Sequence, residues 1–170
     1  MWFGIMMLFF VFALGFTLGG LLSTPKQPPQ LMHVILFSFV FCVLTYLGML
    51  SGMFVTSWVA FGFIEIIIVI LTFLFIIASV TNFHPTFGFF GHGRPIVLIL
   101  LSSLFFVMGF EWGIVELRTF FTVSAAILFF CAICLGLFIQ QQIQALLWRY
   151  SYIVYLPLIW LLFVTIIKLL

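Results

Sequence analysis

Glu65 is the one acidic residue that hydropathy puts inside an apolar run long enough to cross a bilayer. Counted from Phe54 or Thr56, it lies about 9 to 11 residues into that run, roughly 14 to 16 Å and near the bilayer midplane. Ionisable groups at this depth often mark proton pathways, so Glu65 is a candidate proton relay. No Lys or Arg of the chain lies at matching depth. The alternatives are a neutral acid with one interhelical hydrogen bond, or a pair with another subunit.

Two other groups of side chains could do chemistry. Cys131 and Cys134 have a metal or redox spacing, but they lie in an apolar run without a second ligand pair, so we interpret them as packing residues. His84, His92 and Arg94 share one loop, where contact with headgroups or a neighbouring subunit is favoured over a metal. We therefore predict no metal site.

The remaining acidic residues, Glu111 and Glu116, follow an apolar run and are expected at headgroup level or facing a partner. No Ser/His/Asp set, phosphate-binding loop or dinucleotide fingerprint is present in the sequence. The chain is therefore not expected to hold a catalytic centre or a cofactor of its own.

The composition decides what surrounds these side chains. Of 170 residues, 67% are apolar and 5% are charged, against about 25% charged in a soluble domain. Lipid must therefore cover much of the surface, and a soluble globule is excluded. The net charge of +2 is too small for a nucleic-acid partner. We expect one integral membrane domain over residues 1–170, with lipids and other membrane subunits as partners.

The apolar runs are continuous rather than alternating, which indicates helices and not barrel strands. The expected fold is an all-α, polytopic transmembrane bundle of five to six helices, with a fourth run that is short for a full span. No internal repeat is evident. The runs are Trp2 to Leu22, Leu31 to Leu50, Phe54 to Val80, Pro95 to Phe110, Thr119 to Ile139 and Tyr150 to Leu170.

Two pairs of glycines have the spacing that lets helices approach closely in a membrane. Gly15 and Gly19 lie on one face of the first run, and Gly48 and Gly52 lie on one face of the second. Such pairs also arise by chance in a chain with 13 glycines. We interpret them as candidate helix-packing positions.

From Val34 to Asn82, the string VILFSFVFCVLTYLGMLSGMFVTSWVAFGFIEIIIVILTFLFIIASVTN resembles chain 6 of NADH:ubiquinone oxidoreductase, the respiratory complex I subunit called J in bacteria. The likeness is one of layout: a Pro-containing loop, a second helix, a tight turn, and a third helix ending near Asn. The final helix, ending in Thr-Ile-Ile-Lys168, is also similar. The family has five helices and carries a Tyr-Gly pair in helix three, whereas this chain has Ile64 to Ile67 there.

The resemblance implies a core membrane-arm subunit of a proton-pumping enzyme, next to the quinone module, with Glu65 beside a hydrated chain of carboxylates and lysines. It would be an enzyme only as a subunit, and NAD, FMN, iron-sulfur clusters and ubiquinone would belong to other subunits. Two alternatives remain: a structural or assembly subunit of another organelle respiratory complex, or a small independent channel or transporter.

The expected location is the mitochondrial inner membrane. The N-terminal run lacks the features of a signal or transit peptide, so we expect it to be retained as a helix. With 26 Phe but a single Asn, the composition suggests a T-rich coding strand and hence an organelle-encoded, multi-pass protein.

Overall fold

The computed structural model describes residues 2–23, 31–54, 58–83, 89, 95–115, 117, 119–146 and 151–169, and within them all regular structure is helical. The predicted all-α fold is therefore confirmed. The helices are α1 (Trp2–Leu22), α2 (Leu31–Gly52), α3 (Trp58–Thr81), α4 (Ile96–Ile114), α5 (Thr119–Leu146), the short 3-10 helix η1 (Ser151–Tyr155) and α6 (Leu156–Leu169).

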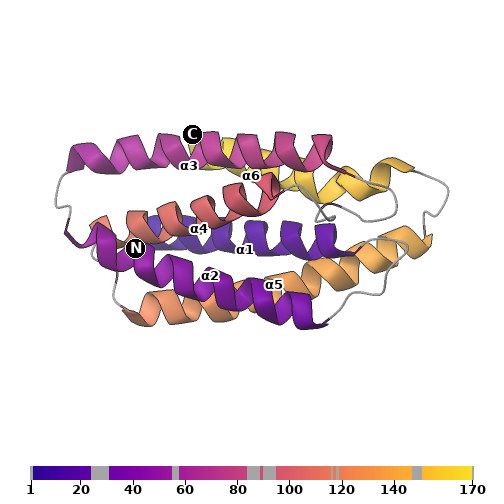
Figure 1. Ribbon diagram of the computed structural model, residues 1–170, viewed down its shortest axis with the longest axis horizontal. Helices are drawn as coiled ribbons and strands as arrows, with labels where there is room; N and C mark the ends of the chain where they lie inside the picture. The colour runs from indigo at the N-terminus through magenta and orange to yellow at the C-terminus, as the bar shows by residue number, and fades with distance from the viewer. Residues whose placement is uncertain are drawn as a thin grey trace.

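Five of these helices, α1 to α5, are long and apolar enough to cross a membrane. This composition supports a multi-pass membrane protein. Large apolar side chains on the outside of the bundle, such as Phe39 and Ile127, fit the same conclusion, because lipid is the solvent that tolerates them. Figure 1 shows the six α-helices running back and forth along the long axis of the molecule.

The last apolar run, expected as one span from Tyr150 to Leu170, changes from a 3-10 helix to an α-helix along its length. η1 precedes α6, and α6 has only 14 residues, or about 21 Å. The change of helix type comes just before Pro157, the second residue of α6, which has no N–H to donate to the carbonyl of Ile153. Gln140 of α5 supplies the missing donor, with 2.9 Å from its Nε2 to the Ile153 oxygen.

Three other helix boundaries differ from expectation. α5 does not end at Ile139 but continues through Gln140 to Leu146. α4 does not end at Phe110 but continues to Ile114, giving a 19-residue helix of full span length. Hydropathy ends the run early because it penalises Glu111, whereas the fold buries this residue. α3 begins at Trp58 rather than near Phe54. Glu65 therefore lies about 10 Å from the start of α3, nearer one end of the span than the midplane position we expected.

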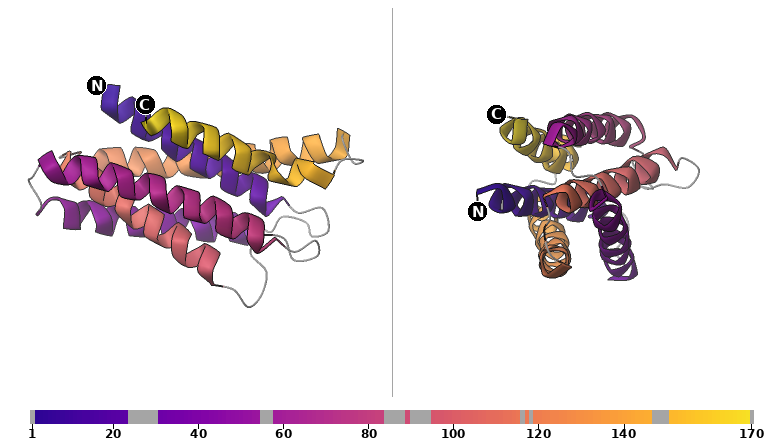
Figure 2. Two further views of the ribbon diagram at one scale, coloured as in Figure 1. Left: turned by 90° about the horizontal axis from the view of Figure 1, so that it is seen from above. Right: turned by 90° about the vertical axis from the view of Figure 1, so that its left-hand side faces the viewer.

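The helices form three layers. Figures 1 and 2 show α3 and α6 in one outer layer, α1 and α4 in the middle, and α2 and α5 in the other outer layer. We call the end of the bundle where α2 ends and α3 begins the Gly52 end, and the end where α3 ends and α4 begins the Thr81 end. Each helix runs from one of these ends towards the other.

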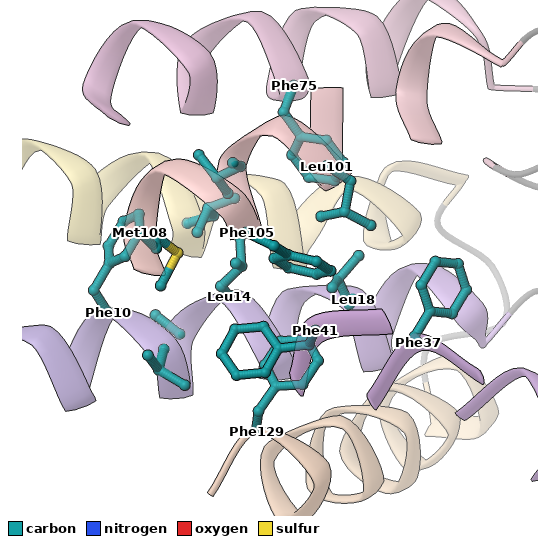
Figure 3. Packing of buried hydrophobic residues seen from close by; sticks show 14 of the residues in the cluster. Phe10, Leu14, Leu18, Phe37, Phe41, Phe75, Leu101, Phe105, Met108 and Phe129 are labelled. Carbon is teal, nitrogen blue, oxygen red and sulfur yellow. The ribbon is translucent and has the colours of Figure 1, made fainter. Parts of the chain in front are cut away.

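Aromatic packing fills the centre of the bundle. Phe41 of α2 stacks on Phe129 of α5 with ring centroids 4.0 Å apart, and Phe105 of α4 meets Phe41 edge to face at 5.0 Å. Figure 3 shows these rings beside Leu14 and Leu18 of α1. The three rings come from three helices. They connect the outer layer of α2 and α5 to α4 in the middle layer.

Close helix contacts occur at all four glycines named from the sequence. A Cβ atom at Gly19 would meet the backbone oxygen of Ile133, and one at Gly15 would lie 2.9 Å from the Cβ of Ala132, so α1 packs closely on α5. Gly48 and Gly52 make the same kind of contact with the α4 backbone, at Phe106 and Phe110. Only residues without a side chain allow this approach.

The partner helices carry small residues at the same spacing. Gly109 and Gly113 of α4 lie against the backbone oxygens of Thr45 and Met49, and Gly136 of α5 lies against that of Phe16. In each pair, contacts further along one helix involve residues further along the other helix. The pairs α1–α5 and α2–α4 are therefore parallel, and both are joined by small residues on both sides.

These contacts reveal an inverted repeat. α1 packs on α5 and α6, and α4 packs on α2 and α3. If α1 is matched with α4, α2 with α5 and α3 with α6, each helix has the same neighbours as its match. An odd number of helices in each half makes the halves run in opposite directions through the bilayer. The expectation of no repeat is wrong for the fold, because the repeat lies in the spacing of small residues and not in overall residue identity.

Candidate functional site

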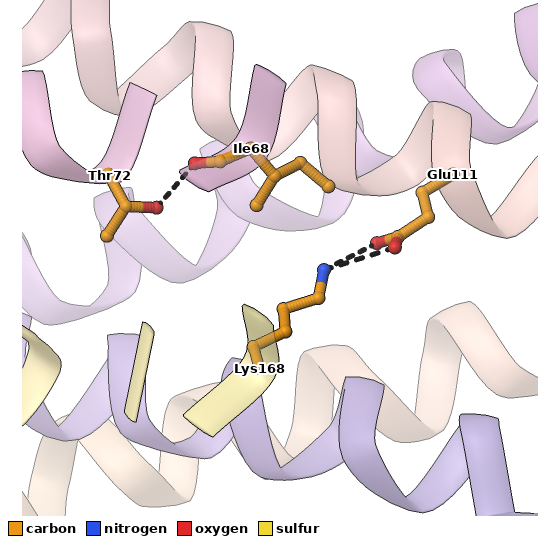
Figure 4. Close-up of polar contacts among 4 residues, drawn as sticks. All are labelled: Ile68, Thr72, Glu111 and Lys168. Atoms are coloured by element: carbon orange, nitrogen blue, oxygen red, sulfur yellow. Dashed lines mark hydrogen bonds and ion pairs between the residues drawn. The ribbon is translucent and has the colours of Figure 1, made fainter. Parts of the chain in front are cut away.

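The clearest polar contact in the described residues joins Glu111 of α4 to Lys168 of α6. The Lys168 ammonium lies 3.1 Å from each carboxylate oxygen of Glu111. The two side chains are 7% and 2% exposed, respectively. Figure 4 shows the ammonium directed at both oxygens across the gap between the helices. An ion pair so far from solvent must satisfy both charges within the protein.

Three elements hold Lys168 in this position. The residue lies in the last turn of α6, where the helix dipole favours a positive charge. Its ammonium also lies 5.1 Å from the centroid of the Phe10 ring on α1, a cation–π distance. Lys168 thus joins α6 to both middle-layer helices, α1 and α4.

Glu65 lies near this pair. Its carboxyl group is half-buried on α3, the helix that packs on α4 and α6, and within the described residues no hydrogen bond or ion pair joins it to Glu111 or Lys168. The interaction between two negative charges is unfavourable and is relieved when either group holds a proton. α3, α4 and α6 therefore bring two acids and one amine together towards the Gly52 end.

Buried hydroxyl groups accompany the charged side chains. Thr72 of α3 donates to the Ile68 carbonyl at 2.7 Å (Figure 4), and Thr165 of α6 donates to the Leu161 carbonyl at 2.7 Å. Each donor proton is used within its own helix, which leaves the oxygen lone pairs as acceptors. These oxygens can accept a hydrogen bond from water or from a protonated group.

Glu111 does not face a partner, as the sequence alone allowed. Its side chain is buried within the bundle against Lys168, and its neighbours Trp112 and Gly113 are buried too. The cation that the sequence analysis did not assign to an acid, Lys168, pairs with Glu111 and not with Glu65 in the described part of the chain. The sequence did hold a signal for this pair: if six helices alternate, Glu111 and Lys168 end on the same side.

The cysteine interpretation needs a similar correction. Cys131 and Cys134 are exposed on α5, not packed in the core, and Cys42 is half-buried. Their side chains face outward because the small residues of α5 that contact α1 lie on the opposite face. Within the described part of the chain, no three His, Cys, Asp or Glu side chains gather where they could hold a metal ion. His84, His92, Arg94 and Glu116 lie outside the described residues.

The arrangement can hold and transfer a proton. Glu111 and Lys168 can exist as an ion pair or, after proton transfer across 3.1 Å, as a neutral acid and amine. A neutral pair avoids the cost of charge in a medium of low dielectric constant. Glu65 supplies a second carboxyl group on α3, which packs on both α4 and α6.

Comparisons with known protein families, with curated proteins and with solved structures find no match to this chain.

Proposed function

We propose that this chain is a multi-pass membrane subunit that carries protons through the interior of the bilayer by way of Glu65, Glu111 and Lys168. The observation that supports this proposal is the buried ion pair, with both carboxylate oxygens 3.1 Å from the ammonium. Removing charges from water is expensive, so a buried pair is a poor choice for stability alone. Intramembrane acids and lysines are typical of proton pathways.

The transfer proceeds in small steps. A proton that reaches Glu65 removes the repulsion between Glu65 and Glu111. When the proton passes to Glu111, the carboxylate that holds the Lys168 ammonium is neutralised, and the ion pair weakens. Loss of a proton on the far side restores the pair. Each step forms one O–H or N–H bond as another breaks, and none changes an oxidation state.

The host that we propose is a proton-pumping NADH:ubiquinone oxidoreductase of the mitochondrial inner membrane, of which this organelle-encoded chain is a core membrane-arm subunit. The support is the sequence resemblance from Val34 to Asn82, together with a group of carboxylates and a lysine at one site. The chain takes part in catalysis only as a subunit, and redox cofactors belong to its neighbours. The described residues form six α-helices, whereas that family has five.

A variant of the pair tests the proton role. Replacing both charges together, Glu111→Gln with Lys168→Met, leaves no unpaired charge, so we expect assembly to persist. Proton pumping in membrane vesicles supplied with NADH should fall severely while the protein remains in its complex, and Glu65→Gln should impair pumping in the same way. The control is Thr17→Val, because Thr17 occupies on α1 the place that Glu111 occupies on α4. Unchanged pumping in the assembled double variant contradicts the proposal and favours a structural subunit.

Association tests the host. In mild-detergent extracts separated on native gels, we expect the chain to migrate with NADH-oxidising activity. Migration with a different respiratory complex would contradict the proposed host and favour a structural or assembly subunit of that complex.

A second candidate, a small proton-coupled transporter, is favoured by the inverted repeat. Many secondary transporters consist of two halves with opposite orientation and have their site where the halves meet. Here Glu111 and Lys168 belong to one half and Glu65 to the other. Migration of the chain by itself on the native gel, with proton flux in liposomes that contain only this chain, would favour the transporter over the subunit.

A further inference from the structure

A line of polar side chains follows one face of α3 away from the ion pair. Glu65, Thr72 and Ser79 are spaced about two helical turns apart and therefore share a face. Thr72 and Ser79 are fully buried. Because α3 packs on α4 and α6, this face is turned into the bundle. The line covers about 21 Å of a bilayer core of about 30 Å.

The hydroxyl group of Ser79 has no hydrogen-bond partner within the described part of the protein. A buried hydroxyl group left unpaired is unfavourable, and such groups in native proteins commonly bind an internal water. Ser79 differs here from Thr72, whose donor proton is already used by the Ile68 carbonyl. Ser79 thus has both its donor and its acceptor sites free, as a water-binding residue needs.

The region between the ion pair and Ser79 also contains hydroxyl groups. Thr165 lies one turn before Lys168 on α6 and is fully buried. The Thr165 and Thr72 oxygens come from two helices that pack together. Each retains acceptor lone pairs for water. Polar oxygen atoms therefore continue from the charged site along the α3–α6 side of the bundle towards the Thr81 end.

We infer that water molecules bound along Thr72 and Ser79 connect the Glu65–Glu111–Lys168 site to the Thr81 end of the bundle and conduct protons between them. A proton moves along such a file as each water forms one O–H bond and gives up another, so no oxidant or co-reactant is needed. The inference rests on the proposed proton function, and it adds the direction and the residues of the route.

Cysteine labelling tests whether the route is hydrated. In full-length protein whose native cysteines, Cys42, Cys131 and Cys134, are replaced by Ala, we would compare Ser79→Cys with Ala78→Cys. Ala78 is a buried neighbour at the same depth on another face of α3. Ag⁺, a small aqueous thiol reagent, is added to intact membranes, and free thiols are then counted with a maleimide after denaturation.

We expect Ag⁺ to block Ser79→Cys roughly tenfold faster than Ala78→Cys, because thiol reactivity follows access to water. Equal or slower blocking of Ser79→Cys would overturn the inference. The same contrast is expected at Thr72→Cys if the file continues to the ion pair, and an unreactive Thr72→Cys would overturn that continuity.

Proton flux separates a failure of the route from a failure of the function. Ser79→Ala should lower flux severalfold, Ser79→Thr should restore it, and Ser38→Ala should leave it unchanged, since Ser38 is a second unpartnered hydroxyl group on another helix. If the Glu111/Lys168 variant loses flux while Ser79→Ala keeps it, the proposed function stands and this route is wrong. If Ser79→Cys is hydrated but the charge variants keep full flux, the proposed proton function fails instead.

Discussion

The two halves of the bundle share a packing plan but not a chemistry. Gly15 and Gly19 contact α5 as Gly109 and Gly113 contact α2, with the two halves facing in opposite directions. Between the glycines of each pair lies one buried polar residue, Thr17 on α1 and Glu111 on α4. Thr17 is satisfied by the carbonyls of Ala13 and Pro157 at 2.8 and 3.2 Å, whereas Glu111 needs a cation.

This difference separates two kinds of constraint. Small residues at close helix crossings are needed in both halves, because backbone approach is a matter of volume. A charged pair is not needed for such packing, because on α1 a hydrogen-bonded threonine fills the corresponding position without the desolvation penalty of a buried ion pair. The two halves therefore pack alike, and the buried ion pair belongs to the second half alone within the described residues.

The largest expected effect is the removal of one charge. Glu111→Ala leaves the Lys168 ammonium buried without its partner, so we expect a loss of about 3 to 5 kcal/mol in the free energy of unfolding. The matched change in the other half, Thr17→Ala, should cost only about 1 kcal/mol, the worth of a neutral hydrogen bond. Titration of the purified chain with SDS in mixed micelles measures both values, and equal losses would contradict the comparison.

The next effect tests the shared packing. Gly19→Val and Gly113→Val each push a side chain into backbone of the neighbouring helix, at Ile133 and Met49, respectively. Overpacking of this kind should cost about 3 kcal/mol in both halves. Gly62→Val is the control, since no heavy atom lies within 4 Å of its would-be Cβ, and its effect should stay within about 0.5 kcal/mol. A large loss at Gly19 with none at Gly113 would show that the halves do not pack alike.

A smaller effect concerns the change of helix type that distinguishes the last apolar run from the continuous α3. Gln140→Leu removes the donor to the Ile153 carbonyl, which should destabilise the protein by about 1 to 2 kcal/mol. Pro157→Ala supplies the missing backbone N–H, so the two changes together should cost less than their sum in a double-mutant cycle. Strict additivity in that cycle would mean that Gln140 does not compensate for the proline.

The smallest effect is expected on the outer face of α5. Cys131→Ala and Cys134→Ala remove side chains that are exposed in this chain, so the isolated protein should change by less than about 0.5 kcal/mol. In native membranes, a neighbouring subunit on this face should slow labelling of both thiols by a lipid-soluble maleimide. Equal labelling rates before and after solubilisation would indicate lipid, and not protein, on this face.

The sequence predicts well that the protein is helical and that its surface suits a lipid bilayer. Continuous apolar runs demand helices in a bilayer, because every backbone N–H and C=O group must be satisfied within its own segment. All six expected runs contain an α-helix, and the bounds of α1 and α2 lie within two residues of the predicted ones. The errors lie where a residue's polarity and its burial disagree: Glu111 shortened the predicted fourth helix, and Pro157 was not recognised as the point near which the last one changes helix type.

The sequence by itself determined an all-helical membrane protein, since composition and run length act locally and leave few other folds. Only the tertiary structure decided that Glu111 meets Lys168, that the helix carrying Glu65 packs on both of their helices, and that the two halves are inverted copies in packing. These facts depend on which helices are neighbours and on how each is rotated about its axis. Hydropathy carries no such information, because in lipid all faces of these helices are nearly equally apolar.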